Sequence, residues 1–347
     1  MKRCVGLIVF EVWNACVNGD PDRDGCPRTR SDGRGTALDV SLKSKLRQLW
    51  TRHNTEYFQA LVEQLGINPE RFHICESWMH GVDTNDPVTA RNAIVELSDN
   101  HAAFCDRLVD SRLFGTTFLP EGEDPEDETA EMPPSDDDNA SADAAEKPKK
   151  GKGKKKKNGT SNGDKVRKHL GLKRTGPVTI THAISVSPVA IEENTITKTA
   201  PLRMTHVASQ QGDMAPQAKK YVVHGVYVAR IFVNPMFTQQ TGCDEMDIEF
   251  FKVTLPDMFA MTTSASRPGG SINMIHIWWA EHQSILGDFN EMKFWESLTP
   301  TRKDGSNEPS TSLDDYIIPT PEIAKLPYKV IDLMNPRYKF TKSAVTK

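Results

Sequence analysis

The sequence predicts an α+β fold whose core is ferredoxin-like. Its elements follow the order β-α-β-β-α-β once long polar insertions are set aside. Three observations predict this order: an apolar segment followed by an amphipathic helix, two strand-like segments after residue 176, and a second helix followed by a last strand. The expected elements span residues 3–13, 38–50, 178–186, 221–233, 241–259 and 272–279.

The first strand and the first helix enclose a polar loop. The apolar, β-branched run of the strand stops where a proline cannot donate to a ladder, at Asn18-Gly19-Asp20-Pro21-Asp22. Thr36 stands three residues before Asp39, a pattern that predicts the N-cap of the helix. The leucines of this helix form one buried stripe, at Leu38, Leu42, Leu46 and Leu49.

Basic residues gather in this loop and on this helix. From Arg23 to Arg52 the chain holds eight basic and three acidic residues, a local balance of +5. Such a patch suits a phosphate backbone. The basic residues of the helix lie off the leucine stripe, so the alternative interpretation is a solvated helix face without a ligand.

A helical insertion and a low-complexity segment follow. Apolar periodicity over residues 55–65 and 90–113 predicts a helical subdomain across residues 51–116. Within residues 117–170, the stretch from Glu121 to Glu146 contains twelve acidic residues and that from Lys147 to Lys157 contains eight lysines. Because apolar residues are almost absent, burial of apolar surface cannot offset the conformational entropy that this segment would lose on folding. We therefore predict a disordered insertion. The lysines can add nonspecific phosphate affinity or belong to a solvated linker.

The second half of the chain returns to strands. His182 falls on the apolar face of the second strand, where a satisfied core histidine is expected. The polar excursion over residues 190–220 is too long for a turn and predicts an arm. Pro256 should kink the second helix. Trp278 and Trp279 end the last strand and are expected to pack in the core rather than to stack on bases; residues 283–347 form a C-terminal extension without a chemical motif.

Composition excludes several classes of protein. The six cysteines form no C-x-x-C pair and no zinc-like spacing with histidine, which predicts reduced thiols in a cytoplasmic protein. Glu11 interrupts the apolar run near the N-terminus, so no signal peptide is expected. No apolar run is long enough to span a membrane.

The strongest candidate for catalysis is a cluster of aspartates in the first loop. Asp20-x-Asp22-x-Asp24-Gly25 begins like a calcium loop, but Ser31 stands where a bidentate glutamate belongs. Clustered aspartates could serve a two-metal nuclease. The neighbouring arginines favour another role, in which the carboxylates hold the shape of the loop. We therefore predict no catalytic residue, no metal and no cofactor.

Several motifs occur in order from the first loop to the second helix. They are Asn18-Gly19-Asp20-Pro21-Asp22, Pro27-Arg28-Thr29, Asp32-Gly33, the stretch Asp39 to Arg47, Arg112-Leu113-Phe114-Gly115, Gly176-Pro177-Val178, Thr181-His182-Ala183, Asn194-Thr195-Ile196-Thr197, the stretch Val223 to Tyr227, and Thr241-Gly242. Together they resemble the guide-RNA-binding backbone subunit of type I CRISPR Cascade complexes, most closely that of the type I-C and I-B branches.

This resemblance implies an architecture and a set of partners. It implies an RNA-recognition-like palm over residues 1–50 and 171–282, helical fingers over 51–116 and a thumb hairpin over 190–220. Copies would stack head to tail along a CRISPR guide RNA (crRNA), and displayed guide segments would pair with target DNA in antiviral defence. The implied partners are crRNA, target DNA through the guide, other copies of the chain and other Cascade subunits.

The residues expected to contact RNA come from the loop, the first helix, the arm and a later serine-rich loop. They are Asn18, Asp22, Arg28, Arg30, Arg34, Lys43, Lys45, Arg47, Arg203, Met204, His206, Ser264 and Arg267. The basic residues of the loop and the helix would hold phosphates without reading bases. In the arm, Met204 is a candidate apolar wedge, and Arg203 and His206 are candidate contacts to the RNA backbone. Two alternatives stay open. One is a monomeric RNA-recognition protein; the other is a metal-dependent ribonuclease, as in type III relatives, that uses one of Asp20, Asp22, Asp24, Asp32 or Asp39.

Overall fold

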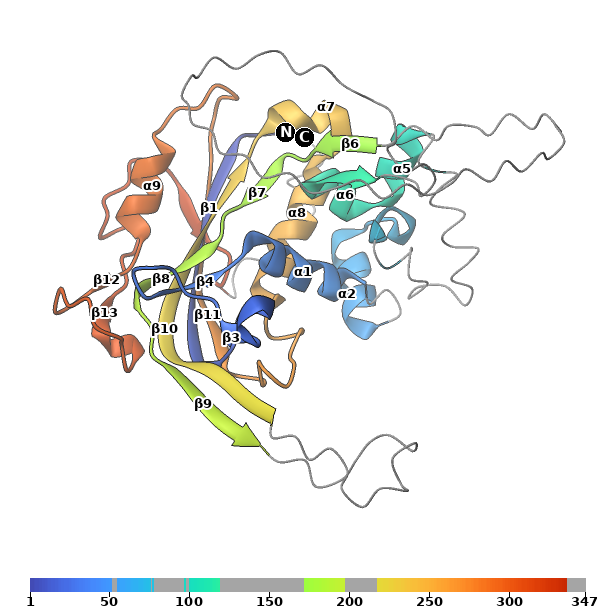
Figure 1. The fold of residues 1–347 in the computed structure, drawn as a ribbon. Helices are drawn as coiled ribbons and strands as arrows, with labels where there is room; N and C mark the ends of the chain where they lie inside the picture. Colours follow the sequence, from blue (N-terminus) through green and yellow to red (C-terminus); the bar gives the residue numbers. More distant parts are fainter. Residues whose placement is uncertain are drawn as a thin grey trace, which may run out of the picture.

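The computed structural model describes residues 1–51, 55–75, 77, 97, 100–118, 172–196 and 217–335. These residues form an eight-stranded antiparallel sheet (Figure 1). The main path runs β14 (Val330–Asp332), β11 (Ile272–Glu281), β1 (Cys4–Ala15), β10 (Gln217–Val233), β8 (Ala183–Pro188) and β4 (Arg34–Ala37), and β10 also pairs with β7 (Val178–Ile180) and β9 (Ile191–Ile196). The predicted α+β class, with a large antiparallel sheet, is confirmed.

Strand β1 lies in the middle of the sheet because both of its faces are apolar. Val5 and Leu7 enter one buried cluster, and Ile8 and Phe10 enter another on the opposite face. A strand that is covered on both faces reads as a nearly continuous apolar run, which explains the first segment of the sequence.

Two helices cover one face of the sheet (Figure 1). Helix α1 (Asp39–Trp50) packs Leu42 and Leu46 into the cluster of Ile8, and helix α8 (Glu245–Thr254) packs Phe250 and Phe251 there. Along the chain α1 separates β1 from β7, and α8 separates β10 from β11. Each helix thus connects two strands of the same sheet.

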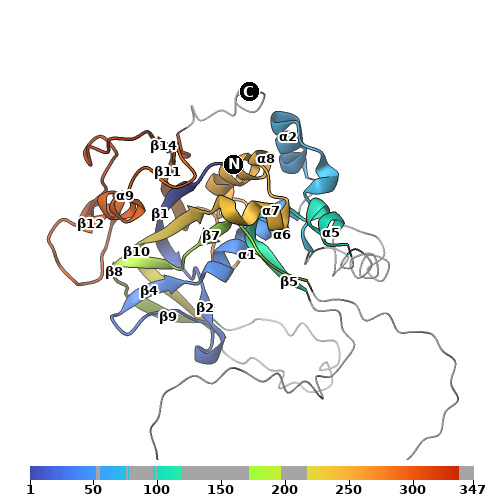
Figure 2. The same ribbon diagram turned by 90° about the horizontal axis from the view of Figure 1, so that it is seen from above.

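The C-terminal segment covers part of the other face (Figure 2). Phe294 and Leu298 of α9 (Glu291–Leu298) and Tyr316 of β13 (Tyr316–Ile317) pack against Val5 and Leu7. β13 pairs with β12 (Thr301–Arg302). Over β1 and β11 this face is therefore closed.

The helical insertion is tied to the sheet-covering helix α8. Its described elements are α2 (Glu56–Leu65), α5 (His101–Arg107), α6 (Val109–Phe114) and β5 (Gly115–Phe118), which pairs with β6 (Leu172–Thr175). Arg112 and Asp247 are both fully buried, and the guanidinium donates to the two carboxylate oxygens at 2.9 and 2.8 Å. This fork joins α6 to α8.

Short elements complete the described part of the chain. They are β2 (Gly19–Asp20), β3 (Cys26–Pro27), α7 (Thr238–Thr241) and the 3-10 turns Pro21–Arg23, Pro69–Arg71, Pro235–Phe237, Leu255–Asp257 and Leu313–Asp315. None of the helices described is long and apolar enough to cross a bilayer.

Three local expectations are corrected by the structure. Thr36 belongs to β4, and Leu38 occupies the N-cap of α1 without a side-chain cap bond. The second strand is split into β7 and β8, because Thr181 Oγ1 accepts the backbone N–H of Arg230 at 3.0 Å. His182 in the break is 53% exposed rather than in the core.

Two expectations concern the second helix and the tryptophans. The segment 241–259 is not one kinked helix: α8 ends at Thr254 and the turn Leu255–Asp257 contains Pro256, consistent with a proline that cannot continue a helix. Trp278 and Trp279 are buried, so their predicted packing role is confirmed.

The predicted insertion and most of the arm lie outside the described residues. Of the segment 117–170, only its first two residues are described, and they belong to β5. Of the arm, β9 and the paired start of β10 are described and extend beyond the body of the sheet (Figure 1).

Candidate nucleic-acid interface

The loop after β1 is anchored to the start of α1. Asn18 Oδ1 accepts the backbone N–H of Leu38 at 3.0 Å, and the Asn18 carbonyl accepts the N–H of Arg28. The loop folds back through the short β2–β3 hairpin. Asp22 is exposed, and its backbone N–H donates to Asp20. Asn18 therefore shapes the loop, whereas the Asp22 side chain faces solvent.

The aspartates of the loop are paired with cations. Asp20 accepts Arg28 at 3.1 Å, and Asp24 accepts Lys220 at 3.3 Å. Asp32 lies 3.8 Å from both Arg30 and Arg34. Within the described residues no three potential ligands converge as a metal site. The pairs agree with the interpretation that these carboxylates hold the loop.

Two of the basic residues on α1 are also engaged. Lys43 Nζ lies 3.0 Å from Asp39 Oδ2, one helical turn away. Arg47 Nε donates to Asp110 Oδ2 at 3.0 Å. Burial raises the pKa of Asp110, and the nearby Arg47 opposes that rise. Both cations thus have carboxylate partners before any ligand binds.

Lys45 and Arg267 differ from their neighbours, because no carboxylate contacts either one in the described part of the chain. Lys45 is 7% exposed, and its ammonium donates only to Gln48 Oε1 at 3.3 Å. Arg267 is half-buried; its Nη1 donates to the Val17 carbonyl at 3.5 Å, and its Nε is buried without a partner. Burial, and then the charge of Arg267, lower the pKa of Lys45 to about 8.

The loop that carries Arg267 is docked onto the end of β1. Ser264 and Arg267 exchange backbone hydrogen bonds at 2.9 and 3.0 Å, closing a tight turn. The backbone N–H groups of Trp13 and Cys16 donate to the carbonyls of Ser271 and Ser266. Ser264 is exposed at this turn. The docking fixes Arg267 beside the first residues of the polar loop.

Two desolvated cations that contact no carboxylate of the described residues are a candidate site for an anion. Burial penalises a charge unless an opposite charge accompanies it, and two like charges add to the penalty. An anion that bridges Lys45 and Arg267 would relieve both costs. Phosphate suits guanidinium and ammonium donors, which form charge-assisted hydrogen bonds to its oxygens.

The predicted arm residues Arg203, Met204 and His206 lie outside the described residues. The base of the arm is connected to the polar loop by Lys220 of β10, which contacts Asp24 at 3.3 Å and Glu193 of β9 at 4.0 Å. The sequence analysis missed Arg230 and Arg302, which lie with Arg30 and Arg34 around a groove. Arg230 could have been noticed, because it is an arginine within the apolar strand β10.

The structure is that of an α+β protein with a large antiparallel sheet and a cluster of basic residues near one end of β1. Residues 2–128 and 157–321 match the family described as CRISPR-associated protein Cas7. The chain belongs to this family, which confirms the resemblance seen in the sequence motifs.

Individual similarities are more limited in extent. The CRISPR-associated protein Cas7 of Haloferax volcanii is 30% identical over 131 residues, which are 38% of this chain and 36% of that protein. The match thus spans about a third of this curated relative. A chain from a "CRISPR RNA-guided surveillance complex, pre-nicking" has 13% identity and a TM-score of 0.38, with 80% of this chain and 75% of that chain covered. A chain from another "CRISPR RNA-guided surveillance complex" has 13% identity and a TM-score of 0.33, with 79% of this chain and 68% of that chain covered.

Proposed function

We propose that this protein is the crRNA-binding backbone subunit of a type I CRISPR surveillance complex. The observation that carries the proposal is the pair Lys45 and Arg267, held without carboxylate partners beside the loop after β1. Membership of the Cas7 family supports crRNA as the source of the phosphates. The type I-C or I-B assignment stays a prediction from the motifs.

The sheet supports an RNA-recognition-like palm. With insertions removed, its strands are ordered β11, β1, β10 and β8, with α1 and α8 as the two connecting helices. This is the arrangement expected for a β-α-β-β-α-β plait. Because the C-terminal segment covers β1 and β11, we place the guide at the loops around Lys45 and Arg267 rather than on the open face of a sheet.

The remaining parts have proposed roles in a filament. Residues 51–116 are the fingers, and the β9–β10 hairpin is the base of a thumb over residues 190–220. Copies of the chain would bind head to tail along crRNA, display guide segments to target DNA and contact other Cascade subunits. We propose no catalytic step, since Asp20, Asp24 and Asp32 of the loop are engaged by cations as described above. This leaves Asp22 as the one aspartate of this loop that no cation contacts among the described residues.

Native mass spectrometry tests the filament. The protein is purified with its RNA, then given guide RNAs lengthened in defined steps. We expect the number of bound subunits to increase with the number of added nucleotides. A constant one-to-one complex would instead identify a monomeric RNA-recognition protein. RNA fragments that appear only with magnesium would identify a ribonuclease, and Asp32→Ala and Asp39→Ala would then locate it.

The lowered pKa of Lys45 predicts a pH dependence of RNA affinity. Phosphate binding needs the charged ammonium and raises its pKa, so binding takes up a proton once the free lysine is neutral. With a free pKa of about 8, we expect the Kd for guide RNA to rise about tenfold between about pH 7 and about pH 9.

Fluorescence anisotropy at constant ionic strength measures this dependence. Lys45→Arg is the matched variant, because arginine keeps its charge throughout this range. Its RNA affinity should change little with pH. An equal loss of affinity in both proteins would show that another group titrates.

A further inference from the structure

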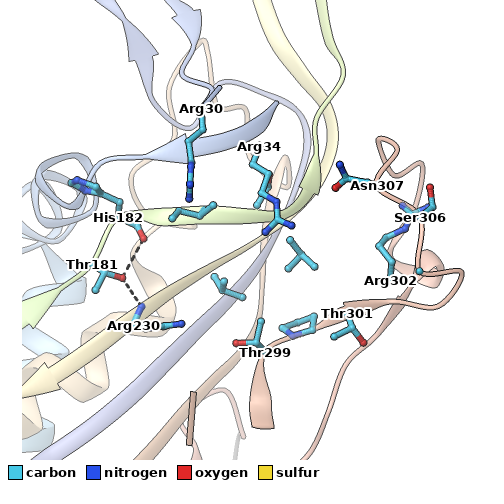
Figure 3. Close-up of a pocket in the computed structure, with 16 residues that line it drawn as sticks. Arg30, Arg34, Thr181, His182, Arg230, Thr299, Thr301, Arg302, Ser306 and Asn307 are labelled. Carbon is cyan, nitrogen blue, oxygen red and sulfur yellow. Dashed lines mark hydrogen bonds between the residues drawn. The ribbon is translucent and has the colours of Figure 1, made fainter. Parts of the chain in front are cut away.

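A groove lies between strands β8 and β10 of the sheet and residues 299–307 of the C-terminal segment (Figure 3). Its volume is about 730 Å³, within the range of ligand sites. Ile184 and Val186 of β8 and Val228 of β10 line it. Val186 and Val228 also pack on the buried cluster beneath α9, so the groove lies on the face opposite α1. It is therefore separate from Lys45.

The charged residues that line this groove are all basic. Arg30 and Arg34 come from the polar loop and β4, Arg230 from β10, and Arg302 from the C-terminal segment (Figure 3). His182 lies at one end of the groove. No aspartate or glutamate is among the described residues that line it. Such a surface attracts an anion.

Three of the four guanidinium groups keep free hydrogen-bonding capacity. Arg30 and Arg34 share one carboxylate, Asp32, at 3.8 Å, which is longer than a hydrogen bond. In the described part of the chain Arg230 meets no carboxylate: it lies 3.9 Å from the Met292 sulfur and over the Trp295 ring.

Arg302 is the exception, because Asp304 fixes its guanidinium through contacts of 3.1 and 3.0 Å. The groove thus combines one immobilised cation with three that a ligand can engage.

We propose that this groove binds a single strand of nucleic acid through its phosphates, independently of the guide site. The guanidinium forks match phosphate oxygens, and the threonine hydroxyls of Thr181, Thr299 and Thr301 are further donors. The aliphatic floor can contact sugars and base faces, which occur between successive phosphates. An acidic protein segment offers no such alternation of charged and flat groups. The groove therefore favours a second strand, bound without base readout.

The test uses the full-length protein loaded with guide RNA, so that the guide site is occupied. Binding of labelled oligo(dT) is measured by anisotropy over a series of salt concentrations, with oligo(rU) as competitor to separate DNA from RNA. Arg230→Gln, at a groove residue that is not among the expected guide contacts, should weaken oligo(dT) binding about fivefold or more and reduce the salt slope by about 0.7, as expected for one lost contact to a single strand. Guide RNA retention should not change.

Two variants make the result specific. Lys325→Gln with Lys329→Gln removes two positive charges from the C-terminal segment outside the groove and should leave oligo(dT) binding unchanged. Arg230→Lys keeps the charge but loses the guanidinium fork and should bind with intermediate affinity.

Unchanged oligonucleotide binding in the glutamine variant would overturn the proposal. A smaller number of subunits per particle in that variant, with oligonucleotide binding intact, would also overturn it and identify a protein interface. If the proposed guide site is wrong, the purified protein will carry no guide RNA. This outcome is seen before any oligonucleotide is added, so it is distinguished from a failure of the groove to bind.

Discussion

Replacing Arg112 by leucine is expected to lower the free energy of unfolding by about 3–5 kcal/mol, because Asp247 is left as an uncompensated buried charge. Both side chains are fully buried. The guanidinium also donates to the carbonyls of Cys105 and Asp106 at 2.9 and 2.6 Å and lies over the Phe72 ring. One substitution therefore removes four hydrogen bonds and the only cation that contacts Asp247 among the described residues. Urea denaturation followed by circular dichroism measures the loss.

An exposed arginine in the same subdomain is the control. Arg71 pairs with Asp106 and Asp244 at 2.9 and 3.1 Å but is 32% exposed. Arg71→Leu should cost about 1 kcal/mol or less, as is usual for exposed ion pairs. Adding Asp247→Leu to Arg112→Leu should restore part of the lost stability, since it removes the stranded charge. Equal losses for Arg71→Leu and Arg112→Leu would contradict this account.

The elements with strong periodic patterns could be predicted from sequence. The apolar run of β1 and the leucine stripe of α1 gave both elements to within two residues, because local pattern and buried face coincide there. The role of Arg112 could not be found in this way. Its partner Asp247 is 135 residues away, and a buried arginine has the same local pattern as a solvated one.

The same limit applies to the candidate site. Sequence placed a basic patch on the loop and on α1, but it could not separate Lys45 from Arg47, two residues further on. Arg47 is paired because α6 brings Asp110 to it. Lys45 has no such partner among the described residues, and burial together with the charge of Arg267, more than two hundred residues later in the chain, lowers its pKa. The C-terminal segment was also underestimated, since its few apolar residues cover one face of the sheet.

Removing the Lys45–Arg267 charges is expected to weaken binding of guide RNA about 100-fold, since each charge-assisted contact contributes about 1.5 kcal/mol or more. The variant is Lys45→Met with Arg267→Gln, and anisotropy at several salt concentrations measures the Kd. Lys2→Met is the control: it removes a charge that pairs with Glu281 at 3.1 Å, away from the site. The affinity of Lys2→Met for guide RNA should be unchanged. An unchanged Kd in the double variant would remove Lys45 and Arg267 from the RNA interface.

Stability should change in the opposite direction to affinity, which separates a binding role from a structural one. The pKa of Lys45 is lowered to about 8 in the folded protein, below about 10.4 in the unfolded chain, so its charged form opposes folding. That penalty is complete below about pH 8 and disappears as the pH rises to about 10.4. Lys45→Met should therefore raise the free energy of unfolding by about 1–2 kcal/mol at neutral pH, with the gain fading in alkali. For Lys2, the hydrogen bond to Glu281 raises the pKa. Lys2→Met should therefore lose stability from neutral pH up to about 10.4, and this loss should fade only as the pH rises above that value. Removing a lysine with a structural role would lower the free energy of unfolding. Removing a lysine that binds phosphate would instead raise the free energy of unfolding and weaken the binding of RNA.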